Sequence, residues 1–136
     1  MRILMIYAER FGYRTSVKAV ESALDVNEEK VIKNVLVGFI HAEGKDEDNM
    51  SYFETKIIKN LKWAARKNNT QKIVLHSFAH LSESKASPEF TKLLLDNSEK
   101  RLQNADYEVY QTPFGYYLDL DLKAPGTSFS RLFREV

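Results

Sequence analysis

The sequence predicts an α/β protein of the α+β type, in which helices pack on a mixed, largely antiparallel sheet. Runs of strand length recur along the chain, and two longer stretches repeat apolar residues at helical spacing. The last two strand candidates are joined only by Thr112–Gly115, a link that is too short for parallel pairing. The 136 residues have the length of one domain, which we place at residues 1–136.

The first forty residues are expected to be mainly extended. Arg2–Ala8 contains four consecutive apolar residues, too few for a helix, and predicts a buried first strand. In Phe11–Val20, β-branched and polar residues alternate, which favours a second strand, and Asp25–Lys30 follows as a charged loop. Val35–Ala42 predicts a further strand, within which Gly38 indicates a bulge or a close backbone approach.

A helix is expected in the middle of the chain. The charged run Gly44–Asn49 predicts a solvated turn. Ser51–Lys67 then carries apolar residues at helical spacing on one face and cations on another, so it predicts an amphipathic helix. Lys72–Phe78 returns to the pattern of a strand.

The last third predicts a second helix followed by short strands. Ser87 can cap a helix that has Pro88 at its first position. Tyr107–Gln111 is expected as a short strand, and Ser128–Val136 closes the domain. Tyr116–Lys123 alternates leucines with charged residues, so we expect one buried face and one wet face.

Composition limits the possible functions. The formal charge is only +1, so there is no broad basic surface for non-specific nucleic-acid binding, and any RNA contact must come from a local cluster. With no cysteine, disulfides, thiol nucleophiles and cysteine-type zinc sites are excluded, and His41 with Glu43 forms no zinc-deaminase pattern. No apolar run approaches the ~20 residues of a membrane span, and no secretory signal is recognisable. We expect a soluble, cytoplasmic protein without a membrane partner.

Two short blocks are not explained by packing. Phe78–Ser82 (Phe-Ala-His-Leu-Ser) ends an apolar run, and Pro113–Tyr117 (Pro-Phe-Gly-Tyr-Tyr) opens the alternating strand. They place an imidazole, a glycine and two phenols at strand ends, where loops commonly carry function. A lone histidine such as His80 is more often structural, however. Ser82 lacks the Gly-x-Ser-x-Gly context of a hydrolase nucleophile, so we interpret it as a loop or capping hydroxyl.

Together with Val35–Ile40 and Met1–Ile6, these blocks resemble the archaeal-type N-terminal editing domain of threonyl-tRNA synthetase over nearly the whole chain. The resemblance implies a D-aminoacyl-tRNA deacylase-like fold, a charged tRNA 3′ end as substrate, no cofactor, and a homodimer formed through the sheet. It implies hydrolysis of the seryl ester of seryl-tRNA(Thr), within a threonyl-tRNA synthetase or in trans to its catalytic subunit. Such proofreading is needed because one methyl group separates threonine from serine and supports only ~10- to 200-fold discrimination.

The resemblance also implies the residues of the site. The catalytic residues would be His80 and Tyr117. The substrate-binding residues would be Phe78, Ala79, Phe114, Gly115, Tyr116 and Leu118. In this superfamily, backbone groups and the 2′-hydroxyl of the terminal adenosine do much of the chemistry, while side chains select the substrate. Gly115 suits this role because a residue without a side chain lets backbone N–H groups approach a ligand.

Two positions depart from the family. After the tyrosine pair the family usually has a lysine that contacts polar groups of the substrate, but this chain has Leu118, and Arg131 stands where the family carries a glutamate. By strand parity Leu118 is expected to point inward into the space of that ammonium, while Lys85 or Lys123 could replace it. An unpaired serine hydroxyl costs ~1–3 kcal/mol, so seryl specificity would weaken or shift. The alternative function is therefore a non-hydrolytic relative that binds tRNA 3′ ends, an amino acid or a partner synthetase.

Two charged groups have alternative interpretations. The cations on the predicted helix fit a contact with the tRNA backbone or, alternatively, a solvated helix face whose last cations complement the helix dipole. The candidate tRNA-binding residues are Lys59, Lys62 and Arg66. Asp119 and Asp121 could bind a metal with His80 and support metal-dependent hydrolysis. Carboxylates on the polar face of a strand are usually solvated, so we expect no metal site.

Overall fold

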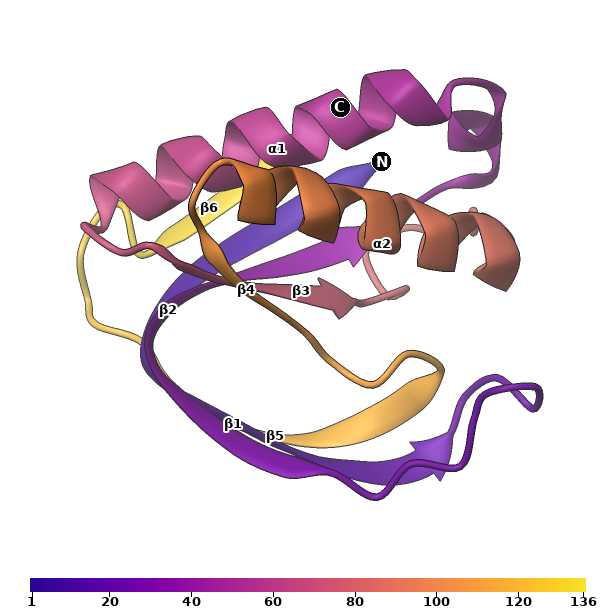
Figure 1. Cartoon of the computed structure of the whole chain (residues 1–136), viewed down its shortest axis with the longest axis horizontal. Helices are drawn as coiled ribbons and strands as arrows, with labels where there is room; N and C mark the ends of the chain where they lie inside the picture. Colours follow the sequence, from indigo (N-terminus) through magenta and orange to yellow (C-terminus); the bar gives the residue numbers. More distant parts are fainter.

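The computed structural model describes all residues from Met1 to Val136, which form one six-stranded sheet and two long helices (Figure 1). The elements in chain order are β1 Arg2–Lys18, β2 Glu29–His41, a 3-10 turn η1 Gly44–Asp48, α1 Met50–Lys67, β3 Lys72–Ser77, α2 Pro88–Asn104, β4 Glu108–Gln111, β5 Tyr116–Lys123 and β6 Arg131–Glu135. The strand order is β4-β3-β2-β1-β5, with β6 also paired to β1. Because β3 runs parallel to β2 and β4 while every pairing of β1 is antiparallel, the predicted mixed, largely antiparallel sheet is confirmed.

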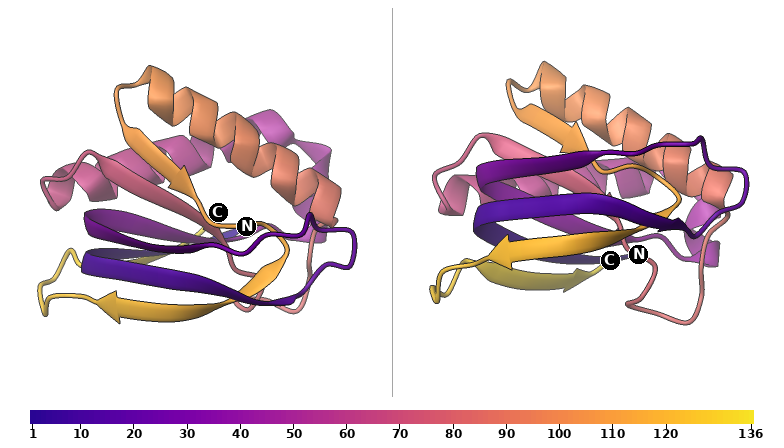
Figure 2. Two further views of the ribbon diagram at one scale, coloured as in Figure 1. Left: turned by 60° about the horizontal axis from the view of Figure 1, so that its bottom comes forward. Right: turned by 90° about the horizontal axis from the view of Figure 1, so that it is seen from below.

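The prediction of two separate strands before residue 20 was wrong, because β1 is a single strand of 17 residues. Its ladder with β2 continues from Arg2 to Arg14 through the polar residues near its middle. On its other edge β1 pairs first with β6 and then with β5, so the two short strands follow each other along it (Figure 2). Pairing with the long strand β2 thus keeps β1 extended where its apolar pattern is interrupted.

β4 and β5, the two strands joined by the link Thr112–Gly115, do not form the expected antiparallel pair. β4 pairs with β3 at one end of the sheet, whereas β5 pairs with β1 at the other. Four residues span at most ~14 Å, so the two edges must approach each other. They do so because the sheet curls, with the second half of β1 and β5 turned beneath the helix-covered part (Figure 1).

Each face of the curled sheet has its own core. A cluster of 17 buried residues joins α1 and α2 to one face, and a cluster of 8 lies on the other. Alternate residues of β2 serve the two clusters, Leu36 and Ile40 the first and Val37 and Phe39 the second, which explains why this stretch is apolar throughout. The expected close approach at Gly38 is confirmed, since a Cβ there would lie 2.9 Å from Leu61 Cδ2 of α1.

Both helices begin where their capping residues indicate. Ser87 accepts a hydrogen bond from the backbone N–H of Phe90, and Pro88 occupies the first turn of α2 as predicted. Asn49 caps α1 in the same way through the N–H of Tyr52. Neither helix has the length and apolarity needed to cross a membrane.

Two details of polarity differ from expectation. The run Gly44–Asn49 is not simply a solvated turn, because Asp46 is buried and forms an ion pair of 3.0 Å with the Met1 ammonium. In β5, Leu118 and Leu122 pack against the second cluster, but Leu120 is 43% exposed. The strand lies at an edge of the sheet, and its leucine face is therefore covered only in part.

Candidate active site

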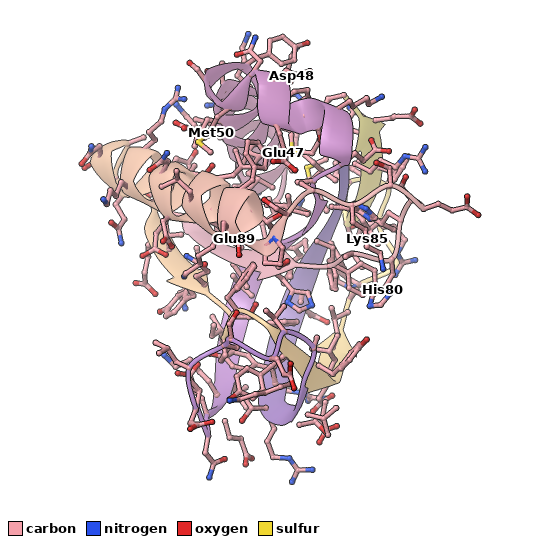
Figure 3. The ribbon with its side chains drawn as sticks, turned by 90° about the vertical axis from the view of Figure 1, so that its right-hand side faces the viewer. Glu47, Asp48, Met50, His80, Lys85 and Glu89 are labelled. Atoms are coloured by element: carbon pink, nitrogen blue, oxygen red, sulfur yellow. The ribbon has the colours of Figure 1, made fainter.

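The curl brings four chain segments to one end of the molecule: the residues just after β1, the loop after β3, the start of α2, and the link from β4 to β5. Together they line a cavity of about 240 Å³. Six of the eight predicted site residues lie on its wall: Ala79, His80, Phe114, Gly115, Tyr116 and Tyr117. Residues more than thirty positions apart in the sequence thus form one recess. Two of its lining residues, His80 and Lys85, are exposed and lie on the same side of the molecule (Figure 3).

The other two predicted residues lie outside the cavity wall. Phe78 packs edge-on against Phe39 at 5.2 Å and against the His80 ring at 4.8 Å, so it supports the imidazole from the core side. Leu118 is paired with Thr15 of β1 and packs against the second cluster. The structure therefore corrects the expectation that Leu118 fills the pocket: its side chain is used for packing.

His80 differs from the other two histidines because its ring has no hydrogen-bond partner in the protein. The His41 ring donates from Nε2 to the carbonyl oxygen of Ser84 at 2.7 Å and accepts at Nδ1 from the N–H of Leu81 at 2.9 Å. His80 instead is exposed and lies nearly parallel to the Tyr117 ring, with 6.3 Å between centroids. Its two ring nitrogens are free to contact a ligand or water.

The two tyrosines have different roles in the structure. The Tyr116 hydroxyl donates to the carbonyl oxygen of Leu24 at 2.8 Å and accepts from the N–H of Val26 at 2.9 Å, so it fastens the β1–β2 loop to the site. Tyr117 is 50% exposed, and its hydroxyl has no protein partner. Only Tyr117 therefore has a phenol available for chemistry.

Gly115 is required by its backbone conformation and by its neighbours. Its φ is +84°, a value that side-chain-bearing residues rarely adopt, and an added Cβ would lie 2.8 Å from the Ala23 Cβ. Its carbonyl oxygen accepts from the N–H groups of Ala19 at 2.7 Å and Val20 at 3.1 Å. Gly115 thus seats the β1–β2 loop against the cavity.

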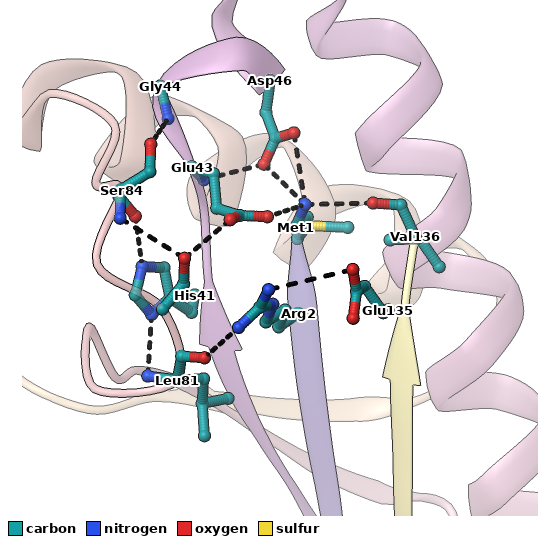
Figure 4. A network of polar contacts seen from close by, with 11 residues as sticks. Met1, Arg2, His41, Glu43, Gly44, Asp46, Leu81, Ser84, Glu135 and Val136 are labelled. Atoms are coloured by element: carbon teal, nitrogen blue, oxygen red, sulfur yellow. Dashed lines mark hydrogen bonds and ion pairs between the residues drawn. The ribbon is translucent and has the colours of Figure 1, made fainter.

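A polar network holds the loop that carries His80 and Lys85 (Figure 4). Ser82 donates from its hydroxyl to Glu43 at 2.7 Å, as expected for a loop hydroxyl, and Glu43 also accepts from the Met1 ammonium at 2.9 Å. These two hydrogen bonds lower the pKa of Glu43 to about 2. Sequence reasoning assigned no role to Glu43, because its partners are about forty residues away in the chain.

His76 holds the link between β4 and β5, and this role could not be seen in the sequence. Its Nδ1 is hydrogen-bonded to the Thr112 hydroxyl at 2.9 Å, at the start of the link that carries Phe114 and Gly115. Burial, together with the nearby His80, lowers the pKa of His76 to about 4. Near physiological pH the imidazole that holds this link is therefore neutral.

A larger cavity of about 620 Å³ adjoins the first. The two share the wall residues Val20, Pro88, Pro113 and Phe114, so they form one groove with two lobes. We call the smaller cavity the inner lobe and the larger cavity the outer lobe. The outer lobe has polar side chains from α2 and β4, among them Glu89, Lys92, Asp96, Glu99 and Gln111. The groove runs between the β1–β2 loop and α2.

The whole chain, residues 1–136, matches the model of the archaea-specific editing domain of threonyl-tRNA synthetase. The chain belongs to this family. Threonine–tRNA ligases are similar to it: that of Hyperthermus butylicus is 36% identical over 140 residues covering 98% of the chain, and that of Methanosphaera stadtmanae is 33% identical over 139 residues covering all of it. The chain spans 22% of the length of each of these relatives.

A solved structure shares the fold of this editing domain. The c-Myc DNA Unwinding Element Binding Protein superposes with a TM-score of 0.69, covering 100% of this chain and 99% of its own, at 12% sequence identity. At that identity the likeness concerns the fold alone. The curled mixed sheet with two helices is the D-aminoacyl-tRNA deacylase-like fold that the resemblance implied.

Lys85, one of the two candidates for replacing the lysine that the resemblance implies, lines the smaller cavity. It is the one residue with a full charge among those that line the inner lobe, and no carboxylate accompanies it. The other candidate, Lys123, lies at the far end of β5 opposite Arg10. Arg131, which the resemblance matched to a glutamate of the family, lies on β6, donates to the carbonyl oxygen of Pro125 at 3.2 Å and is not part of the cavity wall.

The acidic pair of β5 is not positioned as a metal site with His80. Asp119 pairs with Arg14 at 2.6 Å and Asp121 pairs with Arg10 at 3.1 Å, both across the β1–β5 ladder. These carboxylates are compensated by cross-strand cations.

Proposed function

We propose that this editing domain hydrolyses the ester of serine attached to threonine tRNA, within a threonyl-tRNA synthetase or in trans to its catalytic subunit. The observation that carries the proposal is the inner lobe, a small recess without carboxylates in which Lys85, the His80 ring and the Tyr117 hydroxyl are free of protein partners. The family to which the chain belongs supports the tRNA substrate.

The recess has the donors that ester hydrolysis needs. Attack of water on the ester carbonyl develops negative charge on its oxygen, and preorganised N–H groups stabilise that charge. Ala79 and His80 line the cavity, and the backbone N–H group of neither residue has a protein acceptor. We assign them to the oxyanion, and the His80 ring and the Tyr117 hydroxyl to the attacking water. The 2′-hydroxyl of the terminal adenosine, adjacent to the ester, supplies a further hydrogen-bonding group.

The two lobes suit the two parts of an aminoacylated 3′ end. At about 240 Å³ the inner lobe is smaller than the ~300–1,000 Å³ of most ligand sites, and we assign it to the aminoacyl group with Lys85 facing the serine hydroxyl. We assign the outer lobe to the terminal nucleosides. Its carboxylates Glu89 and Glu99 suit hydrogen-bond donors such as ribose hydroxyls and base amino groups.

The test compares threonine tRNA charged with serine and with threonine. The expected result is rapid loss of the seryl ester while the threonyl ester persists, and His80→Ala and Tyr117→Phe should each slow the reaction. Equal cleavage of both esters would contradict the assigned specificity. No cleavage of either ester by a folded protein would contradict hydrolysis itself.

A second candidate function is a non-hydrolytic module that binds the tRNA 3′ end, an amino acid or a partner synthetase. It is favoured by Leu118 and Arg131, which the resemblance matches to a lysine and a glutamate of the family and which lie outside the cavity wall. Tight binding of seryl-tRNA(Thr) with an unchanged ester lifetime would support it. The expected homodimer stays a prediction, to be checked by sedimentation equilibrium.

A further inference from the structure

A separate depression of about 460 Å³ lies between α1 and β6. Its wall includes Lys59, Lys62, Trp63 and Arg66 of α1 and Arg134 of β6, and we call this depression the α1–β6 groove. It shares no residue with either lobe of the candidate active site. The structure thus places the three predicted tRNA-binding cations in one groove and adds an arginine from a distant part of the chain.

The charge of this groove is uncompensated. Its wall contains four cations and no carboxylate, and none of the four takes part in an ion pair. Elsewhere in the protein, Arg10, Arg14 and Lys18 are each paired with an aspartate. Because the whole chain has a formal charge of only +1, the groove is a local concentration of positive charge.

The helix dipole explains only part of this arrangement. Arg66 lies in the last turn of α1, where a cation offsets the negative helix end. Lys59 and Lys62 lie more than one turn before that end, beyond the range of the effect, and Arg134 belongs to a strand. The helix dipole therefore accounts for only one of the four cations, Arg66.

An aromatic plane accompanies the cations. Trp63, the only tryptophan of the chain, lies edge-on to Phe129 at 5.9 Å, and the Arg134 guanidinium lies 5.6 Å from its ring centre. Lys67 approaches the rings of both Trp63 and Phe129. Cations interleaved with aromatic faces are typical of surfaces that follow a nucleic-acid backbone.

We propose that the α1–β6 groove binds the phosphate backbone of tRNA at a distance from the acylated 3′ end. The inference deepens the proposed function and rests on it for the identity of the RNA. The groove supplies affinity through counterion release, without reading bases, while the two-lobed site handles the ester.

A charge-neutralising variant tests the groove with uncharged threonine tRNA, so that this measurement does not depend on hydrolysis. Binding is followed by Trp63 fluorescence and by filter retention over a range of salt concentrations. Lys59→Gln/Lys62→Gln/Arg66→Gln should bind tRNA at least tenfold more weakly, and the slope of log K against log salt should fall by ~0.7–0.9 for each lost phosphate contact. Glutamine keeps the helix propensity of α1.

The matched control removes the same charge elsewhere. Lys30, Lys33 and Lys100 are exposed, lie outside the groove and take part in no ion pair. Lys30→Gln/Lys33→Gln/Lys100→Gln should change the affinity less than twofold. Equal losses in the two variants would show that overall charge governs binding and would overturn the proposal, as would an unchanged affinity in the groove variant.

A second measurement separates this inference from the proposed function. The ratio of kcat/KM for seryl-tRNA(Thr) to that for a seryl-CCA trinucleotide should fall at least tenfold in the groove variant, through KM. An unchanged ratio would contradict RNA binding at the groove. If the parent protein cleaves neither substrate, the proposed hydrolysis fails, while the binding and salt results still decide the inference.

Discussion

At the scale of single residues, the three histidines show how environment assigns roles. His41 has both ring nitrogens bonded to the backbone of the loop after β3, and His76 is buried against the Thr112 hydroxyl. His80 alone is exposed with free ring nitrogens beside a cavity. Residue type does not distinguish a supporting histidine from a reactive one, whereas the satisfaction of its hydrogen bonds does.

Lys85 is expected to carry out the task that the family gives to the residue after the tyrosine pair. Lys85→Met removes the only ammonium of the inner lobe and should lower kcat/KM for seryl-tRNA(Thr) by ~5- to 150-fold, as loss of a ~1–3 kcal/mol polar contact implies. The matched control is Lys45→Met, an exposed lysine outside the cavity. Leu118→Lys should not raise activity, and a large gain there would show that Lys85 does not replace the family's lysine.

The adjacent tyrosines should separate chemistry from loop positioning. Tyr117→Phe removes a free hydroxyl and should lower kcat while the β1–β2 loop keeps its protection from hydrogen exchange. Tyr116→Phe breaks two hydrogen bonds to residues 24 and 26, so exchange should accelerate in residues 19–28. Hydrolysis measured beside hydrogen exchange of each variant checks this. The assignment is wrong if Tyr117→Phe loosens the loop as much as Tyr116→Phe does.

At the scale of elements, the site depends on how loops are fastened to the sheet. The β1–β2 loop rests on Gly115 and Tyr116, and the loop after β3 rests on His41 and Glu43. Each loop is therefore held by an element that is not its neighbour in sequence. Rigid contacts of this kind keep catalytic groups in position without a bound ligand.

Two glycines provide a matched test of this fastening. Gly115→Ala places a Cβ at a φ of +84° and 2.8 Å from the Ala23 Cβ, so it should destabilise the fold by ~1–3 kcal/mol and loosen the β1–β2 loop. Gly126→Ala meets no atom within 4 Å and should change the free energy of unfolding by less than ~0.5 kcal/mol. Urea denaturation measures both. Equal stability of the two variants would contradict the role given to Gly115.

At the scale of the whole molecule, local signals could be predicted and long-range arrangements could not. The N-cap at Ser87 and the close approach at Gly38 follow from neighbouring residues and were confirmed. The mixed sheet was confirmed as well, although the two strands from whose short link it was inferred do not pair with each other. The crossing of the Thr112–Gly115 link between sheet edges follows from the curl, which depends on pairings far apart in the chain. Burial of Asp46 likewise depends on Met1, its distant partner.

In the candidate site, too, the local features could be predicted and the long-range contacts could not. The blocks around His80 and Gly115 could be recognised because their residue types are unusual at strand ends. Lys85 gave only a weak signal, because the loop that carries it is held by Ser82 and His41 through contacts about forty residues away. The different roles of Tyr116 and Tyr117 could not be deduced either, because they depend on where the β1–β2 loop lies.

The stability of the whole fold should fall with acid in two steps. The folded pKa of His76 is lowered to about 4 from 6.5, so the unfolded chain binds a proton first, and stability is lost as the pH falls from 6.5 towards 4. The pKa of Glu43 is lowered to about 2 from 4.5, so its contribution is present above pH 4.5 and is lost as the pH falls towards 2. The pKa shift of the buried His76 corresponds to about 3 kcal/mol of unfolding free energy.

A single substitution separates the two steps. His76→Asn cannot titrate but can still hydrogen-bond to the Thr112 hydroxyl, so the free energy of unfolding should become nearly independent of pH between 6.5 and 4.5 while the step at lower pH persists. Urea denaturation at half-unit pH intervals gives both curves. If the free energy of unfolding of the variant depends on pH above 4.5 as steeply as that of the parent, another group titrates there. The loss of stability in this pH range is then not caused by protonation of His76.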